Sequence, residues 1–191
     1  MEIIDFVSFL LKKVFKPIEI PNAFVEEALE ITTKDVNYHF PLLEREFIIQ
    51  NITCNNNELA IFLYRLGNIC RKYERKDLLP QLHWLLKECC SCELYFNTEI
   101  DTGFYIVHGE GTVIGSRNTI GKGFKIYQGC TVGHRKSTPQ EKGCTIGDNV
   151  TLFANSSIIG PIFIGAGGTI GAHCIITKDI PPNTIITFNR K

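Results

Sequence analysis

"TIGDNVTLFANSSIIGPIFIGAGGTIGAHCII", residues 145–176, places an aliphatic residue at every sixth position. These residues are Ile146, Leu152, Ile158, Ile164, Ile170 and Ile176, and the same spacing occurs upstream at Ile114, Ile120, Ile126 and Val132. A six-residue period is typical of a parallel β-helix, in which each unit is a short strand plus a turn. We expect three units to form one triangular coil with the aliphatic side chains inside. Gly often follows the aliphatic residue, and we expect it to adopt φ > 0 at the corners.

The repeat is interrupted twice. Ile106 and Ile114 are eight residues apart, so two residues are extra within "VHGEGTV", residues 107–113. Val132 and Ile146 are fourteen residues apart, and "GHRKSTPQEKGCT", residues 133–145, has no inward aliphatic residue. This second stretch predicts a loop that leaves the coil. Loops on a rigid scaffold often carry function.

Residues 1–92 have a helical pattern instead. Leu59, Phe62, Leu63, Leu66 and Ile69 follow the three-and-four spacing of one helix face, after an asparagine run that offers N-caps. A second apolar helix follows, with Asp77 as its expected cap, and earlier helices are expected around residues 3–15, 22–31 and 41–50. The predicted fold is α+β, with a helical domain at 1–92 and a β-helix domain at 93–191.

The composition limits the partners and the compartment. Apolar residues make up 44% of the 191 residues, charged residues 21%, and the formal net charge is zero, which gives no reason to expect a nucleic-acid or membrane partner. Acidic residues precede the N-terminal apolar run and lysines follow it, the reverse of a secretory signal. We therefore expect an amphipathic helix there, a cytoplasmic protein, and eight cysteines that are mostly small buried hydrophobes rather than disulfides or metal ligands.

The quoted motifs resemble the hexapeptide-repeat acyltransferases, and within them the serine acetyltransferase group. The matching stretches are "IDTGFYIVHGEGTVIG", "IYQGCTVG" and "IGDNVTLFANSSIIG" with the segment after it, and the resemblance covers roughly residues 93–187. It implies a left-handed β-helix, a homotrimer or dimer of trimers, and acetyl-CoA bound between neighbouring subunits as co-substrate, with no metal.

The resemblance also implies an active site. His108 matches the family's catalytic histidine, and an imidazole suits a general base because its pKa lies near neutrality. Glu93, fifteen residues earlier, matches the carboxylate that orients that histidine. The matching acetyl-CoA-binding positions are Gly133, His134, Arg135, Ala154, Ala172 and Lys178.

Three positions depart from the family pattern. Val107 stands where the family has an acidic residue beside its histidine, Gly143 stands near its second active-site histidine, and Phe153 replaces a Gly of the repeat. Val107 cannot pair with the ammonium group of serine, so this position leaves two acceptors open. The resemblance implies the hydroxyl of L-serine, and the alternative is the hydroxyl of a sugar or surface polysaccharide, which has no ammonium group to pair.

Two other functions fit the repeat less well. A metal hydratase with the same fold needs three histidines at one zinc, whereas His108, His134 and His173 are scattered along the chain. An inactive trimeric scaffold would have no need for both His108 and Glu93.

Overall fold

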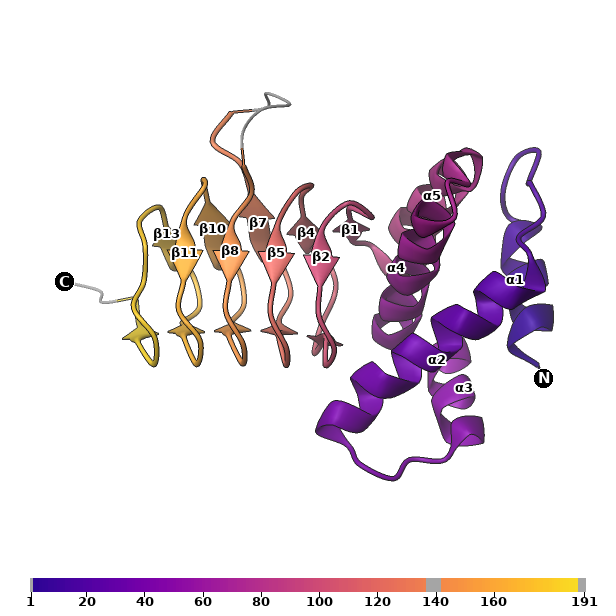
Figure 1. Cartoon of the computed structure of the whole chain (residues 1–191), viewed down its shortest axis with the longest axis horizontal. Coiled ribbons are helices and arrows are strands. Elements are labelled where there is room, and N and C mark those ends of the chain that lie inside the picture. The colour runs from indigo at the N-terminus through magenta and orange to yellow at the C-terminus, as the bar shows by residue number, and fades with distance from the viewer. Residues whose placement is uncertain (1, 137–141, 189–191) are drawn as a thin grey trace.

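A computed structural model of the chain describes residues 2–136 and 142–188. Helices come first and short strands follow (Figure 1). The helices are α1 (Ile3–Leu11), α2 (Asn22–His39), α3 (Arg45–Cys54), α4 (Asn56–Lys72), a 3-10 turn (Lys76–Leu78) and α5 (Leu79–Cys90). The strands are β1 (Glu93–Leu94), β2 (Glu99–Ile100), β3 (Tyr105–Ile106), β4 (Val113–Ile114), β5 (Thr119–Ile120), β6 (Lys125–Ile126), β7 (Thr131–Gly133), β8 (Thr145–Ile146), β9 (Thr151–Leu152), β10 (Ser157–Ile159), β11 (Phe163–Ile164), β12 (Thr169–Ile170), β13 (Ile175–Ile176) and β14 (Ile185–Ile186).

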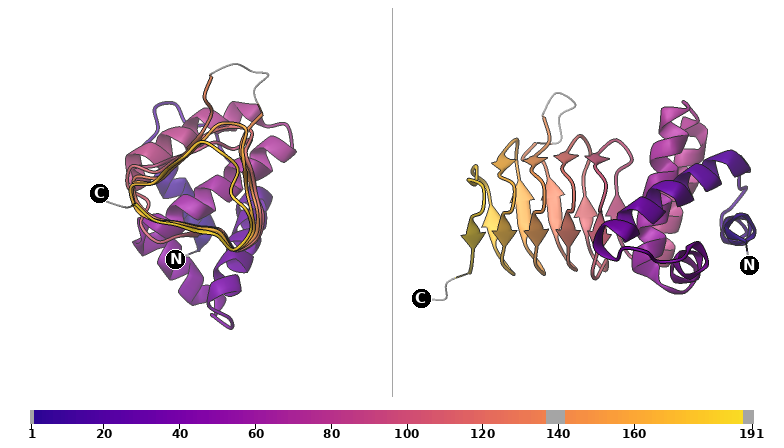
Figure 2. Two further views of the ribbon diagram at one scale, coloured as in Figure 1. Left: turned by 90° about the vertical axis from the view of Figure 1, so that its left-hand side faces the viewer. Right: turned by 60° about the horizontal axis from the view of Figure 1, so that its bottom comes forward.

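The strands form three parallel sheets, which are the three faces of a prism. The first sheet is β1-β4-β7-β10-β13, the second is β2-β5-β8-β11, and the third is β3-β6-β9-β12-β14. Successive strands of the chain belong to different sheets. Each strand therefore pairs with the strand of its own sheet from the preceding coil. Seen along the prism axis, the coils superimpose on a triangle with the helices at one end (Figure 2). The predicted parallel β-helix is confirmed.

The six-residue ladder fills the prism. Each predicted aliphatic position is the second residue of a strand and is buried, from Ile114 at 0% exposed to Ile176 at 6%. Burying one such side chain contributes roughly 1.5–3 kcal/mol relative to leaving it exposed, so the ladder is the main stabilising element of the coil. The residues four positions later, Cys130, Val150, Ser156 and Cys174 among them, close the corners from inside.

The glycines have a different role from the expected one. The positive-φ residue of a corner lies three positions after the aliphatic residue, and it is Gly, Asn, Arg or His: Arg117, Gly123, Gly129, Asn149, Asn155, Gly167 and His173. The glycine directly after the aliphatic residue instead permits close approach of the next coil. A Cβ on Gly147 would lie 2.6 Å from the Ala166 nitrogen, and one on Gly165 would lie 2.3 Å from the Pro182 nitrogen.

Both interruptions are accommodated at corners. Glu93 pairs with Val113, and Val113 pairs with Thr131, so the first interval is two residues longer than the second. Thr119 pairs with Thr145 across the second interruption, whose described residues project from the coil between β7 and β8 (Figure 1). Residues 137–141 of the predicted loop lie outside the described residues.

The predicted helices are present with shifted ends. The Asn55 side chain caps α4 by accepting a hydrogen bond from the Asn57 backbone at 3.0 Å, as the asparagine run predicts. α2 continues to His39 because Thr32 and Asp35 extend its buried face. Asp77 is not the cap of α5, since it pairs with Arg75 instead.

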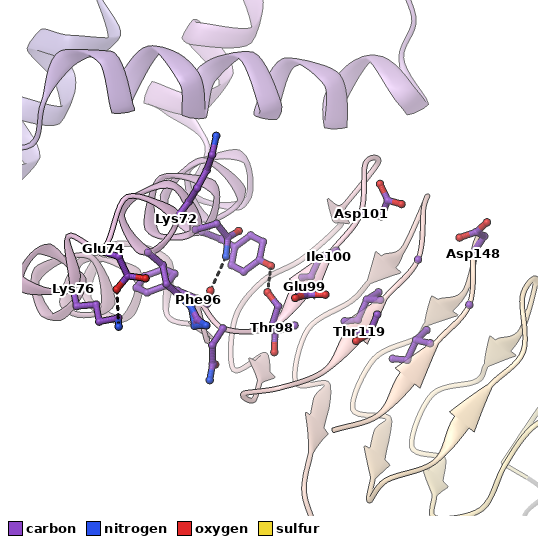
Figure 3. A pocket seen from close by; sticks show the side chains of 18 residues that line it. Lys72, Glu74, Lys76, Phe96, Thr98, Glu99, Ile100, Asp101, Thr119 and Asp148 are labelled. Atoms are coloured by element: carbon purple, nitrogen blue, oxygen red, sulfur yellow. Dashed lines mark hydrogen bonds and ion pairs between the residues drawn. The ribbon is translucent and has the colours of Figure 1, made fainter. Parts of the chain in front are cut away.

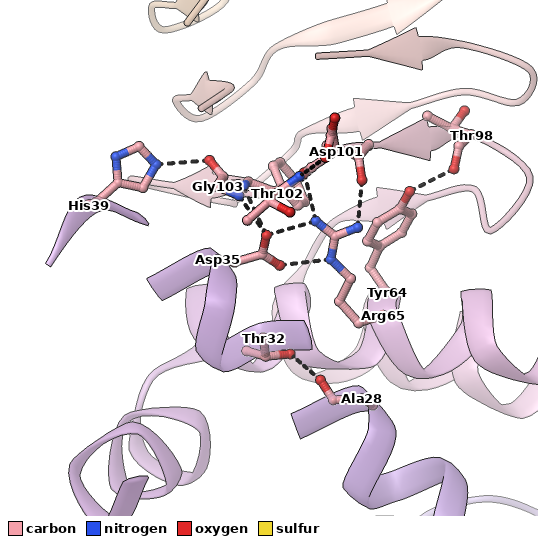
Figure 4. Close-up of polar contacts among 12 residues, drawn as sticks. Ala28, Thr32, Asp35, His39, Tyr64, Arg65, Thr98, Asp101, Thr102 and Gly103 are labelled. Carbon is pink, nitrogen blue, oxygen red and sulfur yellow. Dashed lines mark hydrogen bonds and ion pairs between the residues drawn. The ribbon is translucent and has the colours of Figure 1, made fainter. Parts of the chain in front are cut away.

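A buried ion pair joins the helices to the first coil (Figure 4). The Arg65 guanidinium of α4 donates two hydrogen bonds to the Asp35 carboxylate of α2, at 2.7 and 2.8 Å. It also donates to the carbonyl oxygens of Ile100 and Asp101. Asp35 in turn accepts from the backbone N–H of Gly103 at 2.8 Å. The pair is satisfied on every side, so it fixes α2 and α4 against the turn that follows β2.

None of the eight cysteines, all within the described residues, forms a disulfide. Six are buried as expected, but Cys54 is exposed and Cys89 is half-buried. Among the described residues, no helix has the length and apolar character required to cross a bilayer.

We predict that Arg65→Met destabilises the protein by about 3–5 kcal/mol, because it leaves the Asp35 carboxylate buried without a partner. Urea unfolding followed by circular dichroism measures this loss. Arg45→Met is the matched control: its pair with Glu26 is exposed, so the expected loss is below about 1 kcal/mol. Equal losses in the two variants would contradict the assigned role of Arg65.

Candidate active site

His108 lies at a corner of the prism. It follows β3 and sits within the two-residue interruption before β4, where the third sheet meets the first. Its side chain is exposed, and its ring centroid is 6.1 Å from that of Tyr127, in an edge-on arrangement. We call this corner the histidine edge; it comprises residues 107–112, 127–130, 153–156 and 171–174. The extra residues thus present an imidazole to the outside of a rigid scaffold.

Helix α4 holds the turn that carries His108. The Asn57 side-chain amide donates a hydrogen bond to the Val107 carbonyl at 3.2 Å. A Cβ on Gly109 would lie 3.2 Å from the Asn57 Oδ1 atom, so glycine lets the helix and the turn approach. Gly111 has φ of +71°, and its N–H donates to the Ser91 carbonyl at 2.8 Å. The backbone of the turn that carries the imidazole is therefore held by α4 and by the residue that ends α5.

An apolar row runs along the histidine edge. Backbone hydrogen bonds from Val107 to Ile126, from Tyr127 to Leu152 and from Phe153 to Ile170 place the three donor residues at the same position of successive coils. The rings of Tyr127 and Phe153 are stacked, with centroids 4.8 Å apart. Val107, Tyr127 and Phe153 thus form an apolar row beside His108, and the exposed carboxylate of Glu110 lies on the same edge outside this row.

Glu93 is engaged elsewhere in the single chain. Its carboxylate pairs with the Lys87 ammonium at 2.6 Å, and this hydrogen bond raises the pKa of the lysine. The side chain of Glu93 is 25% exposed. Among the described residues, no hydrogen bond or ion pair links Glu93 to His108.

The remaining predicted residues divide between two edges. Ala154 and Ala172 lie on the histidine edge, half-buried and exposed respectively. Gly133, His134, Arg135 and Lys178 lie where the first sheet meets the second, and we call this corner, residues 133–136 and 177–179, the loop edge. Within one chain, the first sheet separates the two groups.

His134 and Arg135 contact the coil. The His134 Nε2 atom is 2.6 Å from the Ser116 carbonyl oxygen, and its Nδ1 atom is buried without a hydrogen-bond partner. The exposed Arg135 side chain donates to the Thr177 carbonyl and covers Gly160. Lys178 is exposed. The loop edge thus presents the basic side chains of Arg135, Lys136 and Lys178 to solvent.

An open pocket lies away from all these residues. It has a volume of about 710 Å³ and lies on the second sheet, between that face and the end of α4 (Figure 3). Its charged side chains have both signs, including Lys72, Glu74, Glu99 and Asp148. Among the described residues, no cluster of three His, Cys, Asp or Glu side chains could hold a metal ion.

Sequence reasoning missed two residues that shape the histidine edge. Tyr127 could have been found, because it follows an aliphatic position just as Val107 and Phe153 do. Asn57 could not, because it lies fifty residues before Val107 and its N-cap pattern explains it locally.

No family model matches the chain, but individual proteins do. The serine acetyltransferase of Helicobacter pylori is 30% identical over 122 residues, which cover 64% of this chain and 71% of that protein. Serine acetyltransferase 4 of Arabidopsis thaliana is 31% identical over 131 residues, covering 69% of this chain and 37% of that protein. The Staphylococcus epidermidis serine acetyltransferase is 39% identical over 119 residues, which cover 61% of this chain and 53% of that protein. The chain thus spans well under half of the plant relative and about seven tenths of the Helicobacter one.

Solved structures agree on the fold. Soybean serine acetyltransferase aligns with a TM-score of 0.74 and 24% identity, over 88% of this chain and 70% of that one. The Neisseria gonorrhoeae enzyme aligns with a TM-score of 0.72 and 23% identity, over 88% of this chain and 68% of that one. The architecture is therefore the helical region and left-handed β-helix of those structures, and the chain belongs to the serine acetyltransferase family of hexapeptide-repeat acyltransferases.

Proposed function

We propose that the chain transfers the acetyl group of acetyl-CoA to the hydroxyl group of a small acceptor, with His108 as general base. The observation that carries the proposal is the exposed His108 imidazole, held at an interruption of the coil in a member of the serine acetyltransferase family. An exposed imidazole beside an apolar row can receive both an acceptor and a thioester.

The proposed chemistry needs one group that moves a proton twice. The imidazole of His108 takes the proton of the acceptor hydroxyl as its oxygen attacks the thioester carbonyl. The C–S bond then breaks, and the imidazolium returns the proton to the departing CoA thiolate. The products are an O-acetyl ester and free CoA, so atoms and charge balance without a metal or a redox step.

Glu93 is the proposed orienting partner of His108. It would have to leave Lys87, whose side chain is 59% exposed. Exposed ion pairs stabilise proteins by about 1 kcal/mol or less, so exchanging this partner costs little. A carboxylate on the second imidazole nitrogen would fix the tautomer and stabilise the imidazolium.

The division of the site supports a homotrimer, alone or as a dimer of trimers. Threefold packing of prisms would bring the histidine edge of one chain against the loop edge of the next. Acetyl-CoA would then bind between chains, with Ala154 and Ala172 leaving room for its pantetheine arm. Arg135 and Lys178 would face its phosphates, which guanidinium and ammonium groups bind by charge-assisted hydrogen bonds.

L-Serine is the first candidate acceptor. The Neisseria gonorrhoeae relative was solved in complex with serine, and Entamoeba histolytica serine acetyltransferase 1 was solved with L-cysteine. A sugar hydroxyl is the second candidate, favoured by one observation: the row of Val107, Tyr127 and Phe153 directly beside His108 is apolar, and the carboxylate of Glu110 lies outside it. A neutral acceptor needs no carboxylate in this row.

We predict that His108→Ala lowers acetyl transfer by about 10²- to 10⁴-fold, the usual contribution of a general base. The assay follows thiol release from acetyl-CoA with L-serine and with a panel of methyl glycosides. His173→Asn is the control, because His173 is an exposed histidine on the same edge in a left-handed conformation that Asn tolerates. Unchanged release by His108→Ala would refute the mechanism.

We predict that Val107→Asp shifts acceptor preference toward L-serine. A carboxylate at this position can pair with the serine ammonium, and about 1 kcal/mol from that pair raises kcat/KM for serine roughly fivefold relative to a methyl glycoside. Ile185→Asp places the same charge at an exposed apolar position of β14, at the far end of the coil, and should leave the ratio unchanged. If the ratio of kcat/KM for serine to that for the glycoside changed equally in both variants, the effect would not be local to position 107.

We predict that two inactive variants restore activity when mixed. His108→Ala disables the histidine edge and Arg135→Glu disables the loop edge, so each variant keeps one intact half of the site. After the subunits are dissociated and reassembled in equal amounts, random trimers would regain about a quarter of the wild-type rate. A mixture no more active than its two parents would show that both edges act within one chain.

A further inference from the structure

A second, mostly apolar pocket lies between the helices and the first coil. Its volume is about 280 Å³, small for a ligand site. Four aromatic side chains line it: Phe40, Phe47, Phe104 and Tyr105. His108 and Val107 are not part of its lining, so the pocket is separate from the candidate active site.

The aromatic side chains form a wall and a floor. The rings of Phe40 and Tyr105 meet edge to face, with centroids 5.6 Å apart. Phe104 is buried at 1% exposed, whereas Phe40 and Phe47 are 45% and 48% exposed. The pocket is therefore closed by Phe104 on the inside and reaches solvent beside Phe40 and Phe47.

One carboxylate, that of Glu58, lies within this lining. Its Oε2 atom is buried without a hydrogen-bond partner, and the residue takes part in none of the ion pairs among the described residues. Burial raises the pKa of Glu58, and a hydrogen bond from its own backbone N–H offsets this only in part; the charge of Glu58 adds to the effect of burial in raising the pKa of Tyr105. A carboxylate in an apolar pocket is unfavourable unless a cation or a donor compensates it.

Helix capping does not account for this carboxylate. Glu58 lies in the first turn of α4, where the helix dipole favours a negative charge. The Asn55 side chain already caps this helix, however, and the capping geometry leaves Oε2 of Glu58 unpaired.

We propose that this pocket binds a small organic cation, an alkylammonium group whose charge pairs with Glu58 and whose carbon atoms contact the aromatic faces. The negative faces of aromatic rings attract ammonium groups, and several rings around one carboxylate favour a cation over a neutral molecule of the same shape. Phe40, Phe47 and Tyr105 supply those rings. The proposal does not depend on acetyl transfer, because it concerns a separate pocket.

The test compares two probes of one shape, n-butylammonium chloride and 1-butanol, by isothermal titration calorimetry on the full chain. We expect the ammonium to bind at least about tenfold more tightly than the alcohol. Glu58→Gln keeps the size of the side chain and should remove most of that preference. Glu46→Gln, the same change in the first turn of α3 at an exposed position, should keep it.

A second variant separates the ring effect from folding. Phe47→Leu keeps an apolar side chain but removes an aromatic face, so we expect weaker ammonium binding with 1-butanol nearly unaffected. Thermal melts by circular dichroism check that each variant is folded. Equal affinity for the two probes, no binding of either, or an unchanged preference in both Glu58→Gln and Phe47→Leu would overturn the proposal.

Discussion

The guanidinium group of Arg65 is the contact on which the arrangement of the molecule depends. A β-helix has an open end, and the first coil here would expose Leu94, Ile100 and Ile106 without a cover. Helix α4 supplies the cover, and Arg65 attaches it by binding Asp35 on one side and two backbone carbonyls at the end of β2 on the other. Because α4 also carries Asn57, the same attachment determines where the turn with His108 lies.

The coil itself limits where chemistry can be added. Each full turn pairs residues eighteen positions apart, as Val113 with Thr131 and Ser157 with Ile175. Extra residues inside a strand would move inward side chains to the outside, so additional chain can leave only at a corner. Both interruptions do so, one at the histidine edge and one at the loop edge. The regular ladder thus holds two irregular segments on different edges of one rigid prism.

The sequence predicted those features that depend on neighbouring residues. Six-residue spacing reveals the ladder, its interruptions and the exposed corner of His108, because strand, turn and register all lie within one repeat. Arg65 and Asn57 escaped prediction, since their partners are distant in sequence and their helical positions already explain them. Gly147 and Gly165 were assigned the wrong role, because a contact with the next coil cannot be read from one repeat. Asp77 was misread as a cap because Arg75, two residues away, offers a stronger partner.

The first sheet separates the two edges, and this separation affects how activity would depend on protein concentration. If each site is shared by neighbouring chains, an isolated chain carries two halves that cannot meet. Turnover per molecule would then fall on dilution below the assembly threshold, more steeply than protein concentration itself. One chain with substitutions at both edges would also inactivate two of the three sites in its trimer. Under the proposed sharing of sites, the prism would link catalytic output to the amount and the integrity of all the chains present.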